Sequence, residues 1–254
     1  MKKLFSTIAL SFMLLLSVSL FSQTIPKTMN IYEKNGTVTK IPLDRIEKIT
    51  FDGPQITYTE NVVRDGDGNI YQTVKIGHQV WMASNLKTTK YIDGTPINNI
   101  RIGEEWIKTK SGAYCWYMNN SDNKEVFGGL YNWYAVAEDK ICPRGFHVPR
   151  KEEWGALIGY LGSREAGAKL RVAGDQYWKD SQPQTDNSSG FSALPGGVRH
   201  ANATFQGEGT IARWWAIDPR TPDEGEAVIL YNNGSAVIHP ARKMMGFSVR
   251  CVRD

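Results

Sequence analysis

The spacing of apolar residues predicts one amphipathic helix near the middle of the chain, over Pro149–Leu161. Its large apolar residues recur three and four positions apart: Trp154, Leu157, Ile158 and Leu161. That spacing places them on a single helical face. Pro149 suits the first turn, and Gly162 is a common residue just past a helix end. We therefore expect this helix to bury one face in a core.

Elsewhere, short runs of β-branched and aromatic residues alternate with turn residues, which is typical of short antiparallel strands. Ile70–Ile76 and Gln79–Met82 flank the turn Gly77-His78 and predict a hairpin. Further strand candidates lie in the second half of the chain: Phe191–Leu194, Trp214–Ile217, Ala227–Tyr231, Ala236–Ile238 and Phe247–Val252. A second short helix is expected to end at Leu170. The pattern predicts an α+β, loop-rich domain with short antiparallel strands and one or two helices.

Three segments of the first half carry weaker patterns. Leu86–Asn99 is expected to be strand and loop, and Trp106–Tyr117 is expected to be extended. Gly128–Val136 fits either a strand or a short helix, because three of its apolar residues would share one helical face. For this last segment both alternatives stay open.

The N-terminal part of the chain predicts three separate pieces. Residues 1–22 have the form of a signal peptide, because Lys2 and Lys3 precede an apolar run that is too short to span a bilayer. Residues 28–52 predict a small β unit whose strands are Met29–Glu33, Thr37–Ile41 and Ile46–Phe51. Residues 53–61 are expected to be a linker, and residues 62–254 the main domain. We therefore expect a secreted, periplasmic or cell-surface protein with no membrane span.

The charge balance argues against a nucleic-acid-binding role. The formal net charge is +4, and removing the two lysines of residues 1–22 leaves 4 − 2 = +2. We find no clustered basic stretch of the kind that binds phosphate backbones. Eight tryptophans instead favour a core built from large rings.

The chain has three cysteines, Cys115, Cys142 and Cys251. An exported protein can form disulfides, and an odd count leaves one cysteine spare. Cys115 lies in the aromatic run Tyr114–Tyr117, so we expect a buried free thiol rather than a nucleophile.

No motif predicts a catalytic, metal or cofactor site. The four histidines lack metal-ligand spacing, and His147, beside the predicted helix, is expected to be a structural hydrogen-bond partner. Glu152 and Glu153 point in different directions from one helix and cannot act as a glycosidase pair. Asp65–Asn69 resembles half of a calcium loop, but it lacks the glutamate at the twelfth position and is expected to be a polar turn.

The segment Arg213-Trp214-Trp215 is the candidate ligand-binding surface. Side chains alternate across a strand, so one of the two indoles should face the core and the other solvent. An exposed Trp214, flanked by Arg213 and Asp218, could stack on a sugar ring. The alternative is that both indoles pack inside the fold.

Five segments resemble, in order, the Fibrobacter succinogenes major paralogous domain of secreted proteins from Bacteroidetes and Fibrobacteres. They are DGDGNIYQTVKIGHQVWMASNL, GGLYNWYAV, ICPRGFHVPRKEEW, SSGFSALPGG and GFSVRCVRD. The resemblance implies a C-type-lectin-like fold, similar to that of the formylglycine-generating enzymes, and it implies no established activity. Arg150 departs from the pattern where a Ser or Thr helix cap is expected, which should cost about 1 kcal/mol of helix stability.

The same resemblance implies that the helix packs near the final strand, and hence that Cys142 pairs with Cys251. Such a bond closes a loop of about 110 residues, for which loss of chain entropy in the unfolded state gives about 4–5 kcal/mol. A loop-rich domain needs a constraint of this kind.

We therefore expect an exported, non-enzymatic binding or adhesion module that recognises a glycan or a cell-envelope protein through surface loops. One alternative is an enzyme of the formylglycine-generating type, which would need further active-site cysteines. Another is a structural cell-envelope protein. Calcium-dependent sugar binding is disfavoured, because Gln182-Pro183-Gln184 lacks the acid of the lectin loop. The oligomeric state stays open.

Overall fold

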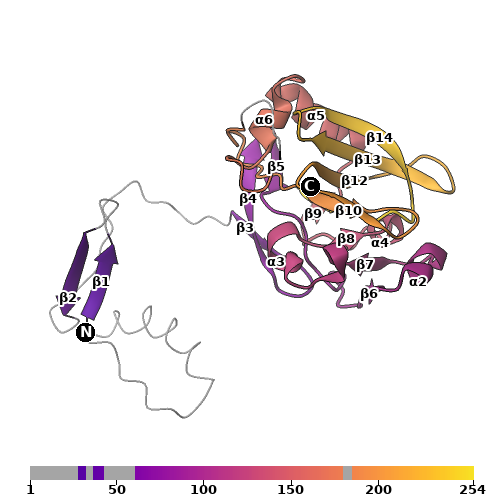
Figure 1. Ribbon diagram of the computed structural model, residues 1–254, viewed down its shortest axis with the longest axis horizontal. Helices are drawn as coiled ribbons and strands as arrows, with labels where there is room; N and C mark the ends of the chain where they lie inside the picture. Colours follow the sequence, from indigo (N-terminus) through magenta and orange to yellow (C-terminus); the bar gives the residue numbers. More distant parts are fainter. Residues whose placement is uncertain (1–27, 33–36, 43–60, 180–184) are drawn as a thin grey trace, which may run out of the picture. The chain divides into compact units, whose positions relative to one another are not determined.

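The computed structural model describes residues 28–32, 37–42, 61–179 and 185–254. The chain divides into two compact units, Met1–Thr59 and Glu60–Asp254, a division inside the predicted linker 53–61 (Figure 1). The predicted signal peptide, the third strand of the small β unit and the segment Gln182-Pro183-Gln184 lie outside the described residues.

In the first unit the described residues form one antiparallel hairpin. β1 (Thr28–Tyr32) pairs with β2 (Val38–Pro42), and the register runs from Thr28 opposite Pro42 to Tyr32 opposite Val38. The first two strands predicted for this unit are confirmed to within one residue at each end.

The second unit is a mixed α+β domain whose main sheet joins its two ends. Its strands, in spatial order, are β3 (Val62–Arg64), β4 (Ile70–Ile76), β5 (Gln79–Met82), β15 (Val252–Arg253) and β9 (Phe146–His147). All four pairings are antiparallel. The predicted hairpin of β4 and β5 is confirmed. Because Val252 lies opposite both Trp81 and His147, the end of the chain is held between earlier strands.

Three smaller sheets complete the domain (Figure 1). One is the antiparallel meander of β12 (Ile211–Pro219), β13 (Glu224–Tyr231) and β14 (Ala236–Arg242). Another is the hairpin of β10 (Gly196–Arg199) and β11 (Phe205–Glu208). The third joins β6 (Asn98–Asn99), β7 (Ala113–Cys115) and β8 (Leu130–Tyr131).

The helices are short except for α5 (Lys151–Leu161), which confirms the predicted amphipathic helix. Trp154, Leu157 and Leu161 are buried on one face, as the spacing indicates. The other helices are α2 (Gly103–Lys108), α3 (Asn123–Phe127), α4 (Trp133–Val136) and α6 (Ala166–Leu170), together with the 3₁₀ turn η2 (Tyr117–Asn119). The segment Gly128–Val136, for which strand and helix were both possible, contains one of each: strand β8 is followed closely by helix α4.

Three predicted strands need correction. Trp106–Tyr117 is not extended throughout, because Trp106 lies in α2 and only Ala113–Cys115 form a strand. Phe191–Leu194 is not a strand and contributes one isolated bridge, between Ala193 and Arg171. Phe247–Val252 is a strand only at its last residue. Before that point the chain crosses between sheets. The Phe247 backbone forms hydrogen bonds with the backbone of Tyr131, and the Ser248 backbone forms hydrogen bonds with that of β12.

Two core clusters lie on opposite faces of β12. Trp214 belongs to a cluster with Trp81, Trp154 and Phe191, and its ring lies 5.5 Å from that of Trp154. Trp215 belongs to the other cluster, where its ring lies 4.4 Å from that of Phe247. The side chains do alternate along the strand, but each face of the strand meets a core.

Candidate functional site

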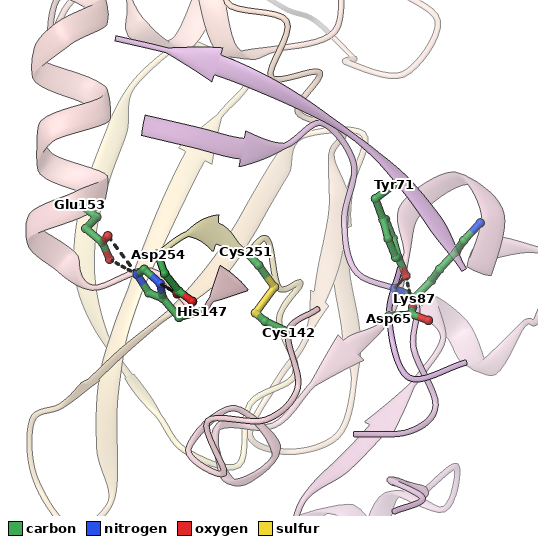
Figure 2. Close-up of a disulfide and its surroundings, with 8 residues drawn as sticks. All are labelled: Asp65, Tyr71, Lys87, Cys142, His147, Glu153, Cys251 and Asp254. Carbon is green, nitrogen blue, oxygen red and sulfur yellow. Dashed lines mark hydrogen bonds and ion pairs between the residues drawn. A yellow bond between two sulfur atoms is a disulfide. The ribbon is translucent and has the colours of Figure 1, made fainter. Parts of the chain in front are cut away.

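The disulfide between Cys142 and Cys251 is present in the structure and lies beside the main sheet (Figure 2). The two Cα atoms are 6.0 Å apart, within the usual range for a disulfide. Both cysteines are buried, and the sequence separation is 109 residues. The expected pairing is therefore formed, and it joins the segment before α5 to the last strand.

His147, on β9, links α5 to the end of the chain (Figure 2). Its Nδ1 lies 2.7 Å from Asp254 Oδ1, and its Nε2 lies 3.0 Å from both carboxylate oxygens of Glu153. Burial lowers the pKa of His147, but the hydrogen bonds with Asp254 and Glu153 outweigh burial and raise it above its ordinary value. The histidine is a structural hydrogen-bond partner, as expected. The two neighbouring carboxylates favour the protonated form of its imidazole.

The acidic run after β3 is a polar turn organised by Asp65. Its Oδ1 accepts the backbone N–H groups of Asp67 and Asn69, at 2.9 and 3.0 Å. Its Oδ2 accepts the hydroxyl of Tyr71, which in turn accepts the backbone N–H of Lys87 at 2.9 Å (Figure 2). Burial, aided by the Asp65 charge, raises the Tyr71 pKa far above its usual range. The Asp65 carboxylate therefore holds a loop together.

Cys115 is a buried free thiol, as expected. Burial raises its pKa to about 11, with a smaller opposing effect from the nearby Arg199 guanidinium. A thiol with this pKa is protonated at neutral pH and is a poor nucleophile.

The predicted ligand platform at Arg213, Trp214 and Asp218 is not an exposed surface. Trp214 is 1% exposed and Trp215 is fully buried, so the alternative that both indoles pack inside the fold is confirmed and the expectation of an exposed indole is wrong. The Trp214 indole N–H donates to Asn85 Oδ1 at 2.9 Å, and the Arg213 guanidinium lies over the Phe247 ring. A sugar ring has no free face of Trp214 to stack on.

Asp218 instead completes the N-terminus of α5. Its Oδ2 accepts the backbone N–H of Lys151 at 2.6 Å, while Glu153 Oε2 accepts the N–H of Arg150 at 2.8 Å. These carboxylates accept backbone N–H groups at a helix start where the Arg150 side chain makes no capping hydrogen bond. Their charge also suits the positive end of the helix dipole.

A polar cavity with an aromatic wall lies in another part of the domain. We call it the Trp116 cavity; it has a volume of about 430 Å³ and is lined by Asn99, Arg101, Tyr114, Trp116, Asn119, Asn120 and Ser121. Volumes of 300–1,000 Å³ are typical of small-molecule sites. The cavity lies entirely within one stretch of the chain, between β6 and α3.

The aromatic wall of the cavity is held edge to face. The rings of Tyr114 and Trp116 are 5.1 Å apart with an interplanar angle of 67°. Trp116 is partly exposed, whereas Tyr114 is buried. Burial raises the Tyr114 pKa, with a smaller opposing effect from its hydrogen bond with Asn99. The phenol thus stays protonated and the indole offers surface to the cavity.

The segment that carries Asn119, another lining residue, has unusual backbone geometry. Met118 and Asn119 both have positive φ, 54° and 55°, a conformation that costs energy in residues other than glycine. The Asn119 amide donates to Arg101 O at 3.1 Å, but its Oδ1 is buried without a hydrogen-bond partner among the described residues. Such strain and unpaired polar atoms are concentrated at functional sites.

A buried arginine from β10 positions the segment that carries Arg101. The Arg199 guanidinium donates to the carbonyls of Ile100 and Arg101 at 2.6 and 2.9 Å. It also lies 4.4 Å from the centre of the Trp106 ring. Arg199 is 1% exposed, so it holds the backbone of Ile100 and Arg101 in place but is not available to a ligand.

The sequence pattern did not predict this cavity, although it contains part of the signal. The aromatic run Tyr114–Tyr117 is followed, after Met118, by the polar run Asn119–Ser121, and binding residues often lie on such loops. What the sequence did not contain is the return of Asn99 and Arg101 to the same place, which depends on the parallel pairing of β6 with β7.

Among the described residues, no group of three His, Cys, Asp or Glu side chains is placed to hold a metal ion. In the same part of the chain, no helix combines the length and apolar character needed to cross a membrane.

Comparison with known proteins identifies the second unit. The profile of the Fibrobacter succinogenes major domain (Fib_succ_major) matches residues 74–253, from β4 through the last strand. No curated protein and no solved structure matches the chain. The match covers well over half of the chain and includes both cysteines of the disulfide, so the chain belongs to the Fibrobacter succinogenes major domain family.

Proposed function

We propose that this chain is an exported, non-enzymatic binding module of C-type-lectin-like fold, and that the Trp116 cavity binds a carbohydrate. The observation that carries the proposal is the combination, in one cavity, of a partly exposed indole with amide side chains and a guanidinium. An indole face can stack on the apolar face of a sugar ring. Amides both donate and accept, so they pair with sugar hydroxyls in either role.

The strained pair Met118 and Asn119 supports the assignment. A backbone held at positive φ in two successive residues is retained only where the surroundings enforce it. Here it orients Asn119 and, beyond it, Asn120 and Ser121 toward the cavity lined by Trp116. The wall of the cavity is thus built before any ligand arrives, which lowers the entropic cost of binding.

The states of the three sulfurs favour a binding module over the formylglycine-generating alternative. Cys142 and Cys251 are joined to each other, and the Cys115 thiol is buried with a raised pKa. A cysteine-dependent enzyme requires an accessible thiolate. We include export in the same proposal, because an exported protein can form this disulfide.

A glycan array probed with residues 23–254 tests the proposal, followed by calorimetric titration of the best-bound sugar. Trp116→Ala should weaken binding about tenfold or more, as is common for a central aromatic contact. Trp116→Phe should bind in between, because it keeps an aromatic ring. Tyr160→Ala is the matched control, since Tyr160 is an exposed aromatic on α5 outside the cavity. Absence of any bound glycan, or equal affinities for Trp116→Ala and the unmodified protein, would refute the proposal.

A further inference from the structure

A second cavity, beside the main sheet, carries three arginines that have no ion-pair partner among the described residues. It has a volume of about 650 Å³; Arg64, Arg144 and Arg253 lie around it, and Val63, Ile92 and Phe146 supply apolar surface. All three arginines are exposed. In the part of the chain that the structure describes, none of the three lies within ion-pair distance of a carboxylate, whereas nine other pairs do. We call this the arginine cavity.

The one acid that lines the arginine cavity is already engaged. Asp254 Oδ1 lies 2.7 Å from His147 Nδ1, on the side that leads to α5. The Arg253 guanidinium lies 5.4 Å from the centre of the Phe146 ring, which fixes its position without neutralising it. The cavity therefore has an excess of positive charge above an apolar surface, and it is complementary to a ligand with both carboxylates and aliphatic groups.

The strand that borders this cavity also has one edge that pairs with no other described strand. β3 is the outermost strand of the main sheet, next to β4. On the β4 side, Asn61 O accepts the N–H of Thr73 at 2.6 Å and the N–H of Asp65 donates to Asn69 O at 3.2 Å. Backbone groups alternate in direction along a strand, so those of Val62 and Arg64 turn toward the open side. Extended peptides bind to such an edge by adding a strand.

We propose that the arginine cavity binds an extended acidic peptide segment of a partner protein, which adds to the free edge of β3. Alternate acidic side chains of the peptide would pair with Arg64 and Arg144, and its aliphatic side chains would lie on Val63 and Ile92. The free backbone edge favours a peptide over an acidic polysaccharide, because a sugar chain cannot extend a β-ladder. This site does not depend on the Trp116 cavity.

The probe is a fluorescent, capped hexapeptide of alternating Glu and Val, titrated into residues 23–254 at low and at physiological salt. We expect saturable binding that weakens with salt. Arg64→Gln and Arg144→Gln should each weaken binding about tenfold, since each removes one charge-assisted contact. Arg164→Gln is the control, because Arg164 is an exposed arginine outside the cavity, and it should leave binding unchanged.

Two further ligands separate the parts of the proposal. The same peptide with N-methyl groups at its valines should bind at least about tenfold more weakly, because it cannot pair with the β3 edge. Oligogalacturonate carries the carboxylates without a peptide backbone and should not compete. The proposal is overturned if the peptide does not bind up to millimolar concentration, if neither arginine variant affects it, or if N-methylation leaves the affinity unchanged. Arginine-dependent binding of oligogalacturonate alone would also overturn it.

Discussion

His147 joins two carboxylates from distant parts of the chain, and this makes the stability of the fold depend on pH. The imidazole pKa is raised in the folded protein, because its hydrogen bonds with Asp254 and Glu153 outweigh the effect of burial. The folded protein then holds the proton more tightly than the unfolded chain. The stabilisation is complete below the unfolded pKa of 6.5 and is lost as the pH rises through the raised folded pKa.

We therefore predict that the His147→Gln variant loses less unfolding free energy than the unmodified protein as the pH rises from 5 to about 9, as measured by urea titration. His200 has a pKa lowered mainly by burial, and its contribution has the opposite sign in both proteins, so the difference between them isolates His147. His78→Gln is the control, since His78 is exposed. Identical pH profiles for His147→Gln and the unmodified protein would contradict the role of the imidazole.

Asp218 shows what a single residue can do that its local sequence does not reveal. It lies 67 positions after Lys151, yet its carboxylate accepts the first free N–H of α5. The local sequence predicted that Arg150 provides no cap, and the structure confirms this. It did not predict that Asp218 accepts the Lys151 N–H, because this contact is supplied through tertiary structure.

Asp218→Ala should lower the free energy of unfolding by about 1 kcal/mol, the usual cost of losing a cap. Asp218→Asn should retain most of this stability, because an amide oxygen also accepts the Lys151 N–H. Asp175→Ala controls for loss of a surface charge, since Asp175 is exposed. Chemical denaturation of the three variants tests the interpretation, and equal effects of the alanine variants at 218 and 175 would disprove it.

At the scale of elements, the period of the apolar pattern predicted α5 and the β4–β5 hairpin. It also predicted the strand Trp214–Ile217, which lies in β12, but it could not decide whether one face of that strand is exposed or both are buried. A strand with Trp214 on one face and Trp215 on the other has the same sequence pattern whether one face is exposed to solvent or both are buried. Both faces are buried because α5 packs on the Trp214 face and Phe247 packs on the Trp215 face, and the pattern of the strand contains neither contact.

The packing of α5 on β12 gives a prediction with an internal control. Trp154 is 1% exposed and its ring lies 4.7 Å from Trp81 and 5.5 Å from Trp214. Trp154→Ala should therefore cost about 3–5 kcal/mol of stability, as for other large-to-small core changes. Tyr160, on the same helix, is 66% exposed, and Tyr160→Ala should change stability by less than about 0.5 kcal/mol. Thermal and urea unfolding of the pair provide the test, and a loss below about 1 kcal/mol for Trp154→Ala would be inconsistent with this packing.

For the whole molecule, two of the segments that carry the family resemblance are joined to each other in the structure. ICPRGFHVPRKEEW and GFSVRCVRD meet through the disulfide, the pairing of β9 with β15 and the contact of His147 with Asp254. The resemblance could therefore predict their proximity. The Trp116 cavity lies between β6 and α3, where none of the matching segments falls. Its geometry depends on local strain and on Arg199, neither of which a periodic pattern contains.

The disulfide stabilises the whole molecule because of how much chain it encloses. Cys142 and Cys251 are 109 positions apart, and the loop contains α5, α6 and the meander of β12, β13 and β14. Restricting a loop of this length in the unfolded chain should contribute about 4–5 kcal/mol. We predict that dithiothreitol lowers the unfolding free energy of the unmodified protein by about this amount and does not affect the double variant Cys142→Ala/Cys251→Ala. Urea titration with and without dithiothreitol measures both. A shift below about 1 kcal/mol would mean that noncovalent contacts already hold the two segments together in the unfolded chain.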